Sequence, residues 1–324
     1  MRRYIRKKML ISFFLLASAV YAGNISVCLW RGSSPDSVLN IYKNKYPGRI
    51  RVVSYKGQSL IINTLDIEDY LAGVLAKEMD SLWPAEALKA QAVVSRTFAL
   101  YTAKENKAKK LPYDIENSIF HQVYGTTGCE RIIKAVKETE GEILTYQGNT
   151  SQVFFHASCG GATAKTSDVW GGNRSHIDSV SCIYCAESPY YAWEKTFSSY
   201  QLSRIFRRAS PVDKITVEET DCSGRVKALK IFSKDGKMYN LTGHQFRMDV
   251  NKCASKVLFN CPDILPSTKF RVLQTGDRFV FQGEGYGHGV GMCQWGARIM
   301  AEKGDNYINI LQYYFPSMEI TVLE

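Results

Sequence analysis

"DIEDYLAGVLAKEMDSLWPAEALKAQAVVSRTFALYTAKEN", residues 66–106, is the stretch that decides the fold. Apolar residues recur at helical spacing on both sides of a short break, which predicts one helix over 66–79 and a second that starts at Pro84. Asp66 is a suitable N-cap for the first helix, and proline is favoured at a helix start. We therefore expect two consecutive helices in this stretch.

Strand-like segments surround these two helices. Residues 50–64 predict two strands around a Lys-Gly turn, and residues 142–158 predict a hairpin. From about residue 191 the pattern changes to short strands and two short helices, which indicates a small α+β unit. The chain as a whole is therefore assigned to the α+β class.

The N-terminal segment differs from the rest of the chain. Residues 1–22 carry five basic residues and then the apolar run "MLISFFLLASAV", a pattern typical of a secretory signal peptide cleaved near Ala22. The run is too short to span a membrane comfortably. We expect an exported protein of the periplasm or cell-wall space, with no stable membrane span after cleavage.

The net charge limits the kind of partner. The chain carries +10, and removal of the five signal-peptide cations leaves about +5. A mildly basic protein suits a polyanionic partner such as a cell wall. The basic residues form no block interleaved with aromatic residues, so we expect no nucleic-acid partner.

The cysteines present two alternatives. All nine follow the predicted signal peptide, and cysteines of exported proteins usually pair in disulfides. However, "FHASCGG" supplies His156 and Cys159, and "SCIYC" supplies Cys182 and Cys185. These residues have the chemistry of a tetrahedral zinc site, and disulfide bonds among the cysteines are the alternative.

Glu78 is an unusual acid. It falls in the last turn of the first predicted helix, where the helix dipole disfavours a negative charge. Its neighbours Met79, Leu82 and Trp83 can remove water from the carboxyl group, which would raise its pKa and suit a general acid. An ordinary surface glutamate is the alternative.

The stretch "GEGYGHGVGMCQWGA", residues 283–297, places five glycines within five residues of His288, at 283, 285, 287, 289 and 291. Glycine is used where φ must be positive or where a group approaches the backbone closely. No βαβ unit follows, so the glycines do not indicate a dinucleotide-binding loop. The remaining alternatives are a tight turn between a strand and a helix, or a loop that holds a ligand.

Several motifs together resemble one family. They are "YLAGVLAKEMDSLWPAEALKAQAVVSRTFAL" (70–100), "HQVYG" (121–125), "FFHASCGGATAKTSDVWGG" (154–172), "LPSTKF" (265–270) and "GEGYGHGVGMCQWGARIMAEKGDNYINILQYYFP" (283–316). In this order they resemble the SpoIID/LytB family of peptidoglycan lytic transglycosylases, which includes sporulation protein D and amidase enhancers. Members commonly have serine where this chain has Cys293, and a small neutral residue should serve equally unless Cys293 is a metal ligand or disulfide partner.

The resemblance implies an architecture and a site. A cleft would lie between a larger core domain, residues 23–190 and 256–324, and a smaller inserted domain, residues 191–255. Glu78 would be the catalytic residue. The substrate-binding candidates are Arg96, His121, Tyr286, His288, Gln294 and Trp295. Some members bind zinc near the active site, and the candidate ligands here are His156, Cys182 and Cys185, with Cys159 as a further one.

The resemblance also implies a reaction. A lytic transglycosylase cleaves the MurNAc–GlcNAc β-1,4 bond and forms 1,6-anhydroMurNAc, a reaction that needs no cofactor. We expect glycan strands stripped of peptide as the substrate, and an N-acetylmuramoyl-L-alanine amidase as a candidate partner. Two alternatives stay open: a non-catalytic wall-binding amidase enhancer, and a zinc-dependent peptidoglycan hydrolase.

Overall fold

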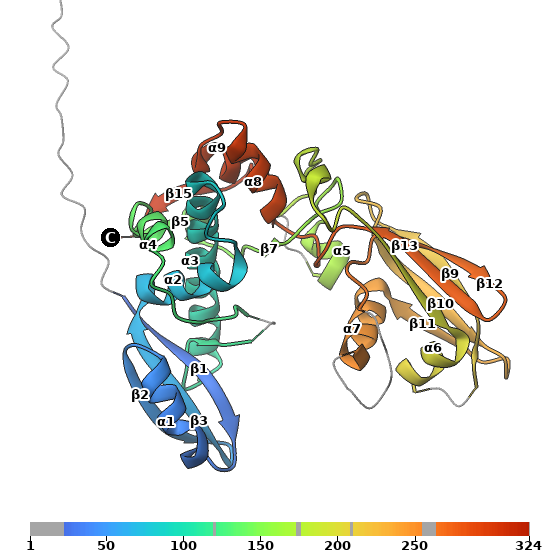
Figure 1. The fold of residues 1–324 in the computed structure, drawn as a ribbon, viewed down its shortest axis with the longest axis horizontal. Helices are drawn as coiled ribbons and strands as arrows, with labels where there is room; N and C mark the ends of the chain where they lie inside the picture. Colours follow the sequence, from blue (N-terminus) through green and yellow to red (C-terminus); the bar gives the residue numbers. More distant parts are fainter. Residues whose placement is uncertain (1–22, 119–120, 173–175, 208–209, 255–263, 324) are drawn as a thin grey trace, which may run out of the picture.

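Helix α3 (Ala85–Ala108) runs through the larger of two units, and the smaller unit lies beside it (Figure 1). The computed structural model describes residues 23–118, 121–172, 176–207, 210–254 and 264–323. The predicted signal peptide lies outside these residues. Each unit has its own cluster of buried apolar side chains.

The two predicted helices are present. Helix α2 (Ile67–Glu78) begins at the N-cap Asp66, whose carboxylate accepts a 2.8 Å hydrogen bond from the Glu68 N–H. Helix α3 begins after Pro84 and buries many alanines, whose short side chains let other helices approach closely. Its neighbours include α2, α4 (Glu130–Lys137), α8 (Gln294–Glu302) and α9 (Tyr307–Tyr314).

Two small sheets flank these helices. The first has the order β2 (Arg49–Tyr55), β3 (Gln58–Asp66), β1 (Asn24–Gly32), β4 (Ile115–Glu116), with α1 (Asp36–Lys45) following β1. The second has the order β15 (Glu319–Val322), β5 (Glu142–Tyr146), β6 (Asn149–Thr150). The turn at Lys56-Gly57 between β2 and β3 is confirmed, and so is the α+β class.

A short parallel pair brings distant segments together. Strand β7 (Phe155–His156) pairs with β14 (Met292–Cys293), so the "FHASCGG" motif lies against the end of the glycine-rich loop. Helix α5 (Thr166–Trp170) and the 3-10 helix η1 (Tyr184–Glu187) follow β7, and η1 contacts α8.

The smaller unit contains two three-stranded sheets. Their orders are β11 (Met238–Thr242), β10 (Val226–Ser233), β9 (Val212–Thr220) and β12 (Phe270–Thr275), β13 (Arg278–Glu284), β8 (Ala192–Ser198). Helices α6 (Ser199–Ile205) and α7 (Gly243–Ala254) pack with them. Its buried cluster takes in Phe270, Phe279 and Phe281, which the sequence analysis placed in the core domain, because β13 pairs along its whole length with β8.

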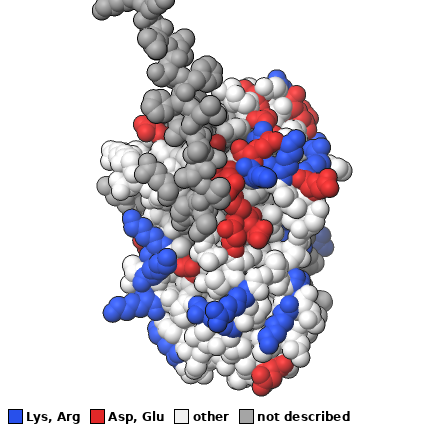
Figure 2. Space-filling model, turned by 90° about the vertical axis from the view of Figure 1, so that its left-hand side faces the viewer, with Lys and Arg blue, Asp and Glu red and all other residues white. Residues whose placement is uncertain are grey.

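The face of the larger unit in Figure 2 is uneven in charge. Lys and Arg spread over its lower part, where α1 and β2 lie, and acidic and basic residues mix above. Helix α1 and strand β2 contribute the exposed Lys43, Lys45, Arg49 and Arg51. Across the part of the chain that the structure covers, no helix is both long enough and apolar enough to cross a membrane.

Candidate functional site

Glu78 is the last residue of α2 and is partly buried. Burial raises the pKa of its carboxyl group, and a hydrogen bond from the backbone N–H of Val123 opposes that shift in part. Burial raises the pKa of the Tyr70 phenol well above its usual value, and the nearby charge of Glu78 adds to that shift. The desolvation expected from the sequence is therefore present, and it favours the proton-donating form of the acid.

The "HQVYG" motif reaches Glu78 through its backbone. Gly73 of α2 has room for no side chain, because an added Cβ would lie 2.1 Å from the carbonyl oxygen of Gly125. The Gly125 N–H donates a 3.2 Å hydrogen bond to the carbonyl oxygen of Gly73. This close approach brings the Val123 N–H to the carboxyl group of Glu78.

A buried chain of amides surrounds Glu78. Gln294 Nε2 donates to the Glu78 carbonyl oxygen and to Gln91 Oε1, each at 3.3 Å. Gln91 Nε2 donates to Ser95 Oγ at 3.0 Å, and the Ser95 carbonyl oxygen accepts a 3.3 Å bond from Gln122 Nε2. Tyr70 Oη then donates to Gln122 Oε1 at 3.0 Å. These hydrogen bonds thereby connect four segments of the chain to one another and to the main chain of Glu78.

Gln91 and Gln122 did not figure among the predicted site residues. Both are almost fully buried, and both stand inside motifs quoted in the sequence analysis. A polar amide on the buried, alanine-rich face of a predicted helix was the available signal for Gln91, because a buried amide needs a partner.

An aromatic pair lies just beyond Glu78. The rings of Trp83 and Trp295 meet edge to face with centroids 5.3 Å apart, and the Arg298 guanidinium lies over both rings. Trp83 belongs to the segment after Glu78, and Trp295 follows Gln294. Gln294 and Trp295 are thus placed next to the Glu78 segment. Aromatic surfaces of this kind suit stacking against sugar rings.

His288 lies in a second aromatic group. Its ring centroid is 5.0 Å from Trp170, 5.6 Å from His156 and 5.8 Å from Phe154. Its Nδ1 accepts a 3.0 Å hydrogen bond from the Val290 N–H. Burial and nearby positive groups hold the pKa of His288 well below its usual value, so the ring is neutral at neutral pH. No contact between His288 and Glu78 appears among the residues whose placement is given.

Two further substrate-binding candidates have structural partners. His121 Nδ1 accepts a 3.1 Å hydrogen bond from the Glu116 N–H, and burial lowers its pKa. The Tyr286 ring packs on Tyr190 with centroids 4.7 Å apart, and its backbone pairs with Ser158. Neither side chain is placed against Glu78.

Arg96 corrects the sequence analysis. Its side chain is fully buried, donates to both carboxylate oxygens of Glu68, and donates to the Glu142 and Val136 carbonyl oxygens. A guanidinium with no exposed surface and this set of partners cannot reach a glycan. Arg96 therefore stabilises the packing of α3 instead of binding substrate.

Four buried cysteines come together near the glycine-rich loop. The Sγ atoms of Cys159, Cys182, Cys185 and Cys293 all lie within 4.8 Å of one another. We call this group the cysteine cluster. Hydrogen bonds from the other three thiols lower the pKa of Cys185, whereas burial raises the pKa of Cys293. No disulfide joins the cysteines for which the structure gives a position.

His156 corrects the predicted ligand set. It is not a member of the cysteine cluster; its Nδ1 lies 3.1 Å from the Val290 carbonyl oxygen, and its ring faces His288. Cys293, which pairs with His156 across β7 and β14, is the fourth member of the cluster instead. Four thiolates satisfy a tetrahedral ion and leave no open position for water, so the cluster does not suit a catalytic zinc.

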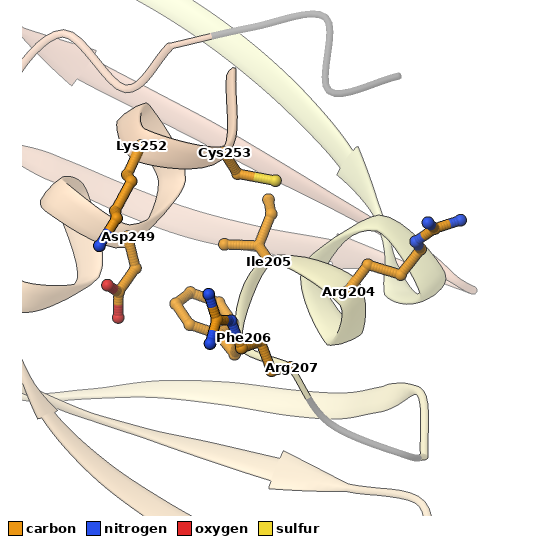
Figure 3. Close-up of a pocket in the computed structure, with 7 residues that line it drawn as sticks. All are labelled: Arg204, Ile205, Phe206, Arg207, Asp249, Lys252 and Cys253. Carbon is orange, nitrogen blue, oxygen red and sulfur yellow. The ribbon is translucent and has the colours of Figure 1, made fainter. Parts of the chain in front are cut away.

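A separate pocket of about 330 Å³ lies in the smaller unit between α6 and α7 (Figure 3). Its lining residues are Arg204, Ile205, Phe206, Arg207, Asp249, Lys252 and Cys253. None of them is a predicted site residue. This pocket is therefore distinct from the site around Glu78.

Comparison with known proteins agrees with these motifs. The family described as stage II sporulation protein, SpoIID, matches residues 55–146, which include Glu78, Gln91 and the "HQVYG" loop. A protein of Bacillus subtilis named stage II sporulation protein D is 28% identical over 84% of this chain and 79% of its own length. The chain belongs to the SpoIID/LytB family.

Other SpoIID/LytB relatives extend the match. An uncharacterized protein of Brachyspira hyodysenteriae is 34% identical over 85% of this chain and 72% of its own length. A Bacillus subtilis protein named amidase enhancer is 26% identical over 78% of this chain and 40% of its own length. A domain of unknown function (DUF8618) matches residues 182–291, which include most of the smaller unit and two members of the cysteine cluster, Cys182 and Cys185.

Proposed function

We propose that this SpoIID/LytB protein is an exported lytic transglycosylase of peptidoglycan, in which Glu78 is the catalytic acid and base. The glycan would lie in a cleft between the two units, on strands from which peptide has been removed. The exposed basic residues of α1 and β2 suit an anionic cell wall.

One observation carries the proposal. The Glu78 carboxyl group is desolvated, its pKa is raised, and it accepts a hydrogen bond from Val123. Glycoside hydrolases use two carboxylates because they must activate water or form a covalent intermediate. A single acid suits a reaction whose nucleophile is part of the substrate.

The proton balance of this reaction needs one group. Protonated Glu78 donates its proton to the glycosidic oxygen as the bond to MurNAc C1 breaks. The MurNAc C6 hydroxyl attacks C1, and the Glu78 carboxylate accepts its proton. The products are a new GlcNAc hydroxyl and a 1,6-anhydro ring, and the acid is regenerated. Such proton transfer contributes about 10²- to 10⁴-fold to the rate.

The test compares residues 23–324 as wild type, Glu78→Gln and Glu130→Gln on peptide-free glycan strands. Glu130 is an exposed acid at the start of α4 and serves as the matched control. Mass spectrometry should find ends lighter by one water with wild type and Glu130→Gln, and none with Glu78→Gln. Ordinary reducing ends would instead show a hydrolase and overturn the proposal.

The second candidate function is a wall-binding amidase enhancer. It is favoured by the relative of that name and by the Trp83–Trp295 surface, which can bind a glycan without cleaving it. In this case no variant cleaves glycan, and wild type and Glu78→Gln stimulate an N-acetylmuramoyl-L-alanine amidase equally. Loss of stimulation in Glu78→Gln would exclude a role that is independent of the carboxylate.

A further inference from the structure

We propose that the cysteine cluster binds one structural zinc ion, which fixes the glycine-rich loop and helix α8 beside Glu78. The ligands are Cys159, Cys182, Cys185 and Cys293. This inference is independent of the proposed reaction, because it would hold equally in a wall-binding protein.

The positions of the sulfur atoms fit a tetrahedral ion. Zinc–sulfur bonds of about 2.3 Å place the four sulfurs about 3.8 Å apart. The Sγ atoms of the cluster lie within 4.8 Å of one another, and those of Cys159 and Cys185 are 3.3 Å apart. A disulfide requires about 2.05 Å. All four side chains are buried, so an ion between them is shielded from water.

The surroundings of the cluster suit four thiolates. The backbone N–H groups of Cys159 and Gly296 point to Cys293 Sγ, at 3.3 and 3.4 Å. Tyr314 Oη lies 3.2 Å from Cys182 Sγ. Cys293 is also the N-cap of α8, where the helix dipole favours negative charge. Partners of this kind orient metal ligands and tune their basicity.

A buried cation compensates the charge. Zinc with four thiolates carries two net negative charges, after each thiol has released its proton. Arg225 is 1% exposed and enters from the smaller unit, where its Nη2 donates a 2.9 Å hydrogen bond to the Cys159 carbonyl oxygen. Its Nη1 also donates to the Ala162 carbonyl oxygen at 3.3 Å. The guanidinium therefore joins the smaller unit to the segment that holds the cluster.

The connectivity explains what the ion would do. Cys159 follows β7, Cys182 and Cys185 flank the start of η1, and Cys293 ends β14. Gln294, the next residue, contacts Glu78 and Gln91. Zinc would cross-link three segments far apart in sequence and hold Gln294 at the acid. Because all four positions are taken by protein, the ion is structural.

The first experiment measures metal in the purified chain. Wild type should contain about one zinc per chain, and Cys182→Ser should contain almost none. Cys28→Ser is the matched control, because Cys28 is equally buried but lies in β1, outside the cluster. Equal zinc in Cys182→Ser and Cys28→Ser would overturn the proposal.

If Cys182→Ser fails to fold, the proposal can still be tested on wild type and on a variant that keeps all four ligands. Replacement of the metal by Co²⁺ should give the intense visible bands and the sulfur-to-metal charge-transfer band of a tetrahedral thiolate site. Tyr314→Phe keeps all four ligands and should weaken zinc binding about 10- to 100-fold against a competing chelator. A folded, metal-free chain with disulfides among these cysteines would overturn the assignment, and so would a brown protein with iron and acid-labile sulfide.

Discussion

Gln294 Nε2 donates a 3.3 Å hydrogen bond to the main-chain oxygen of Glu78, although 216 residues separate the two in sequence. The bond connects the start of α8 to the end of α2. The carbonyl groups at a helix C-terminus lack partners within the helix. The buried amide of Gln294 supplies a partner for the carbonyl group of Glu78. The position of the candidate acid therefore depends on the C-terminal part of the chain.

Gln294→Ala tests that dependence. The substitution leaves the Glu78 carbonyl group and Gln91 Oε1 without this donor, so we expect a loss of about 1–3 kcal/mol in the free energy of unfolding. Urea unfolding measures it, with the exposed Gln274→Ala as control. Equal free energies for the two variants would contradict a structural role for the bond.

The raised pKa of Glu78 predicts a pH-dependent stability. A carboxyl whose pKa is raised by folding stabilises the folded state below the pKa of the unfolded chain, and this stabilisation is lost as pH rises through the folded pKa. Glu78→Gln should therefore raise Tm at pH 7, and the gain should vanish below about pH 4, near the ordinary glutamate value. Thermal unfolding from pH 3 to 8 measures the effect. A Tm difference that is constant with pH would contradict burial of the carboxyl group.

The same pKa shift predicts the pH profile of the proposed reaction. Glycan cleavage requires protonated Glu78, so the rate should fall as pH rises through the raised pKa. The descending limb should lie above about pH 4.3, the value for an ordinary glutamate. Initial rates on peptide-free glycan across the pH range test this expectation. A descending limb at or below the ordinary value would show that the carboxyl group is solvated in the working protein.

Gly289 permits the contact between the glycine-rich loop and Arg225. Its φ is +83°, and an added Cβ would lie 2.3 Å from Arg225 Nε. Gly276 has a φ of +61° but open space around it. Gly276→Ala should cost about 1–2 kcal/mol from backbone strain alone. Gly289→Ala should cost clearly more, because the buried guanidinium must also shift. Chemical denaturation of both variants measures the difference, and similar losses would show that the guanidinium moves freely.

The partly buried Glu68 pairs with the fully buried Arg96, at 2.8 and 2.5 Å. Glu68→Gln leaves the fully buried guanidinium without its countercharge, so we expect a loss of about 3–5 kcal/mol in the free energy of unfolding. Glu302→Gln removes a partner of the more exposed Arg298 pair and should cost about 0–1 kcal/mol. Denaturant unfolding of the two variants provides the comparison. A small loss for Glu68→Gln would mean that water or another acid reaches Arg96.

Local sequence determined the elements that carry the candidate site. Asp66 and Pro84 mark where α2 and α3 begin, and the break between these helices puts Glu78 at a helix end. These features follow from capping and periodicity, which act over a few residues. The motifs also grouped Cys159, Cys182 and Cys185 with His156, but they did not show that Cys293 joins the three cysteines.

Tertiary structure decided which residues meet. The sequence motifs favoured His156 as a metal ligand, left Cys293 open and assigned Arg96 to the substrate, whereas packing places Cys293 among the thiols and Arg96 against Glu68. The contacts of Gln91, Gln122 and Gln294 join four segments, and the β7–β14 register brings together cysteines 134 residues apart. Burial and pairing between distant segments have no local signature, because the free energy of a buried polar group depends on the partners that the complete fold supplies.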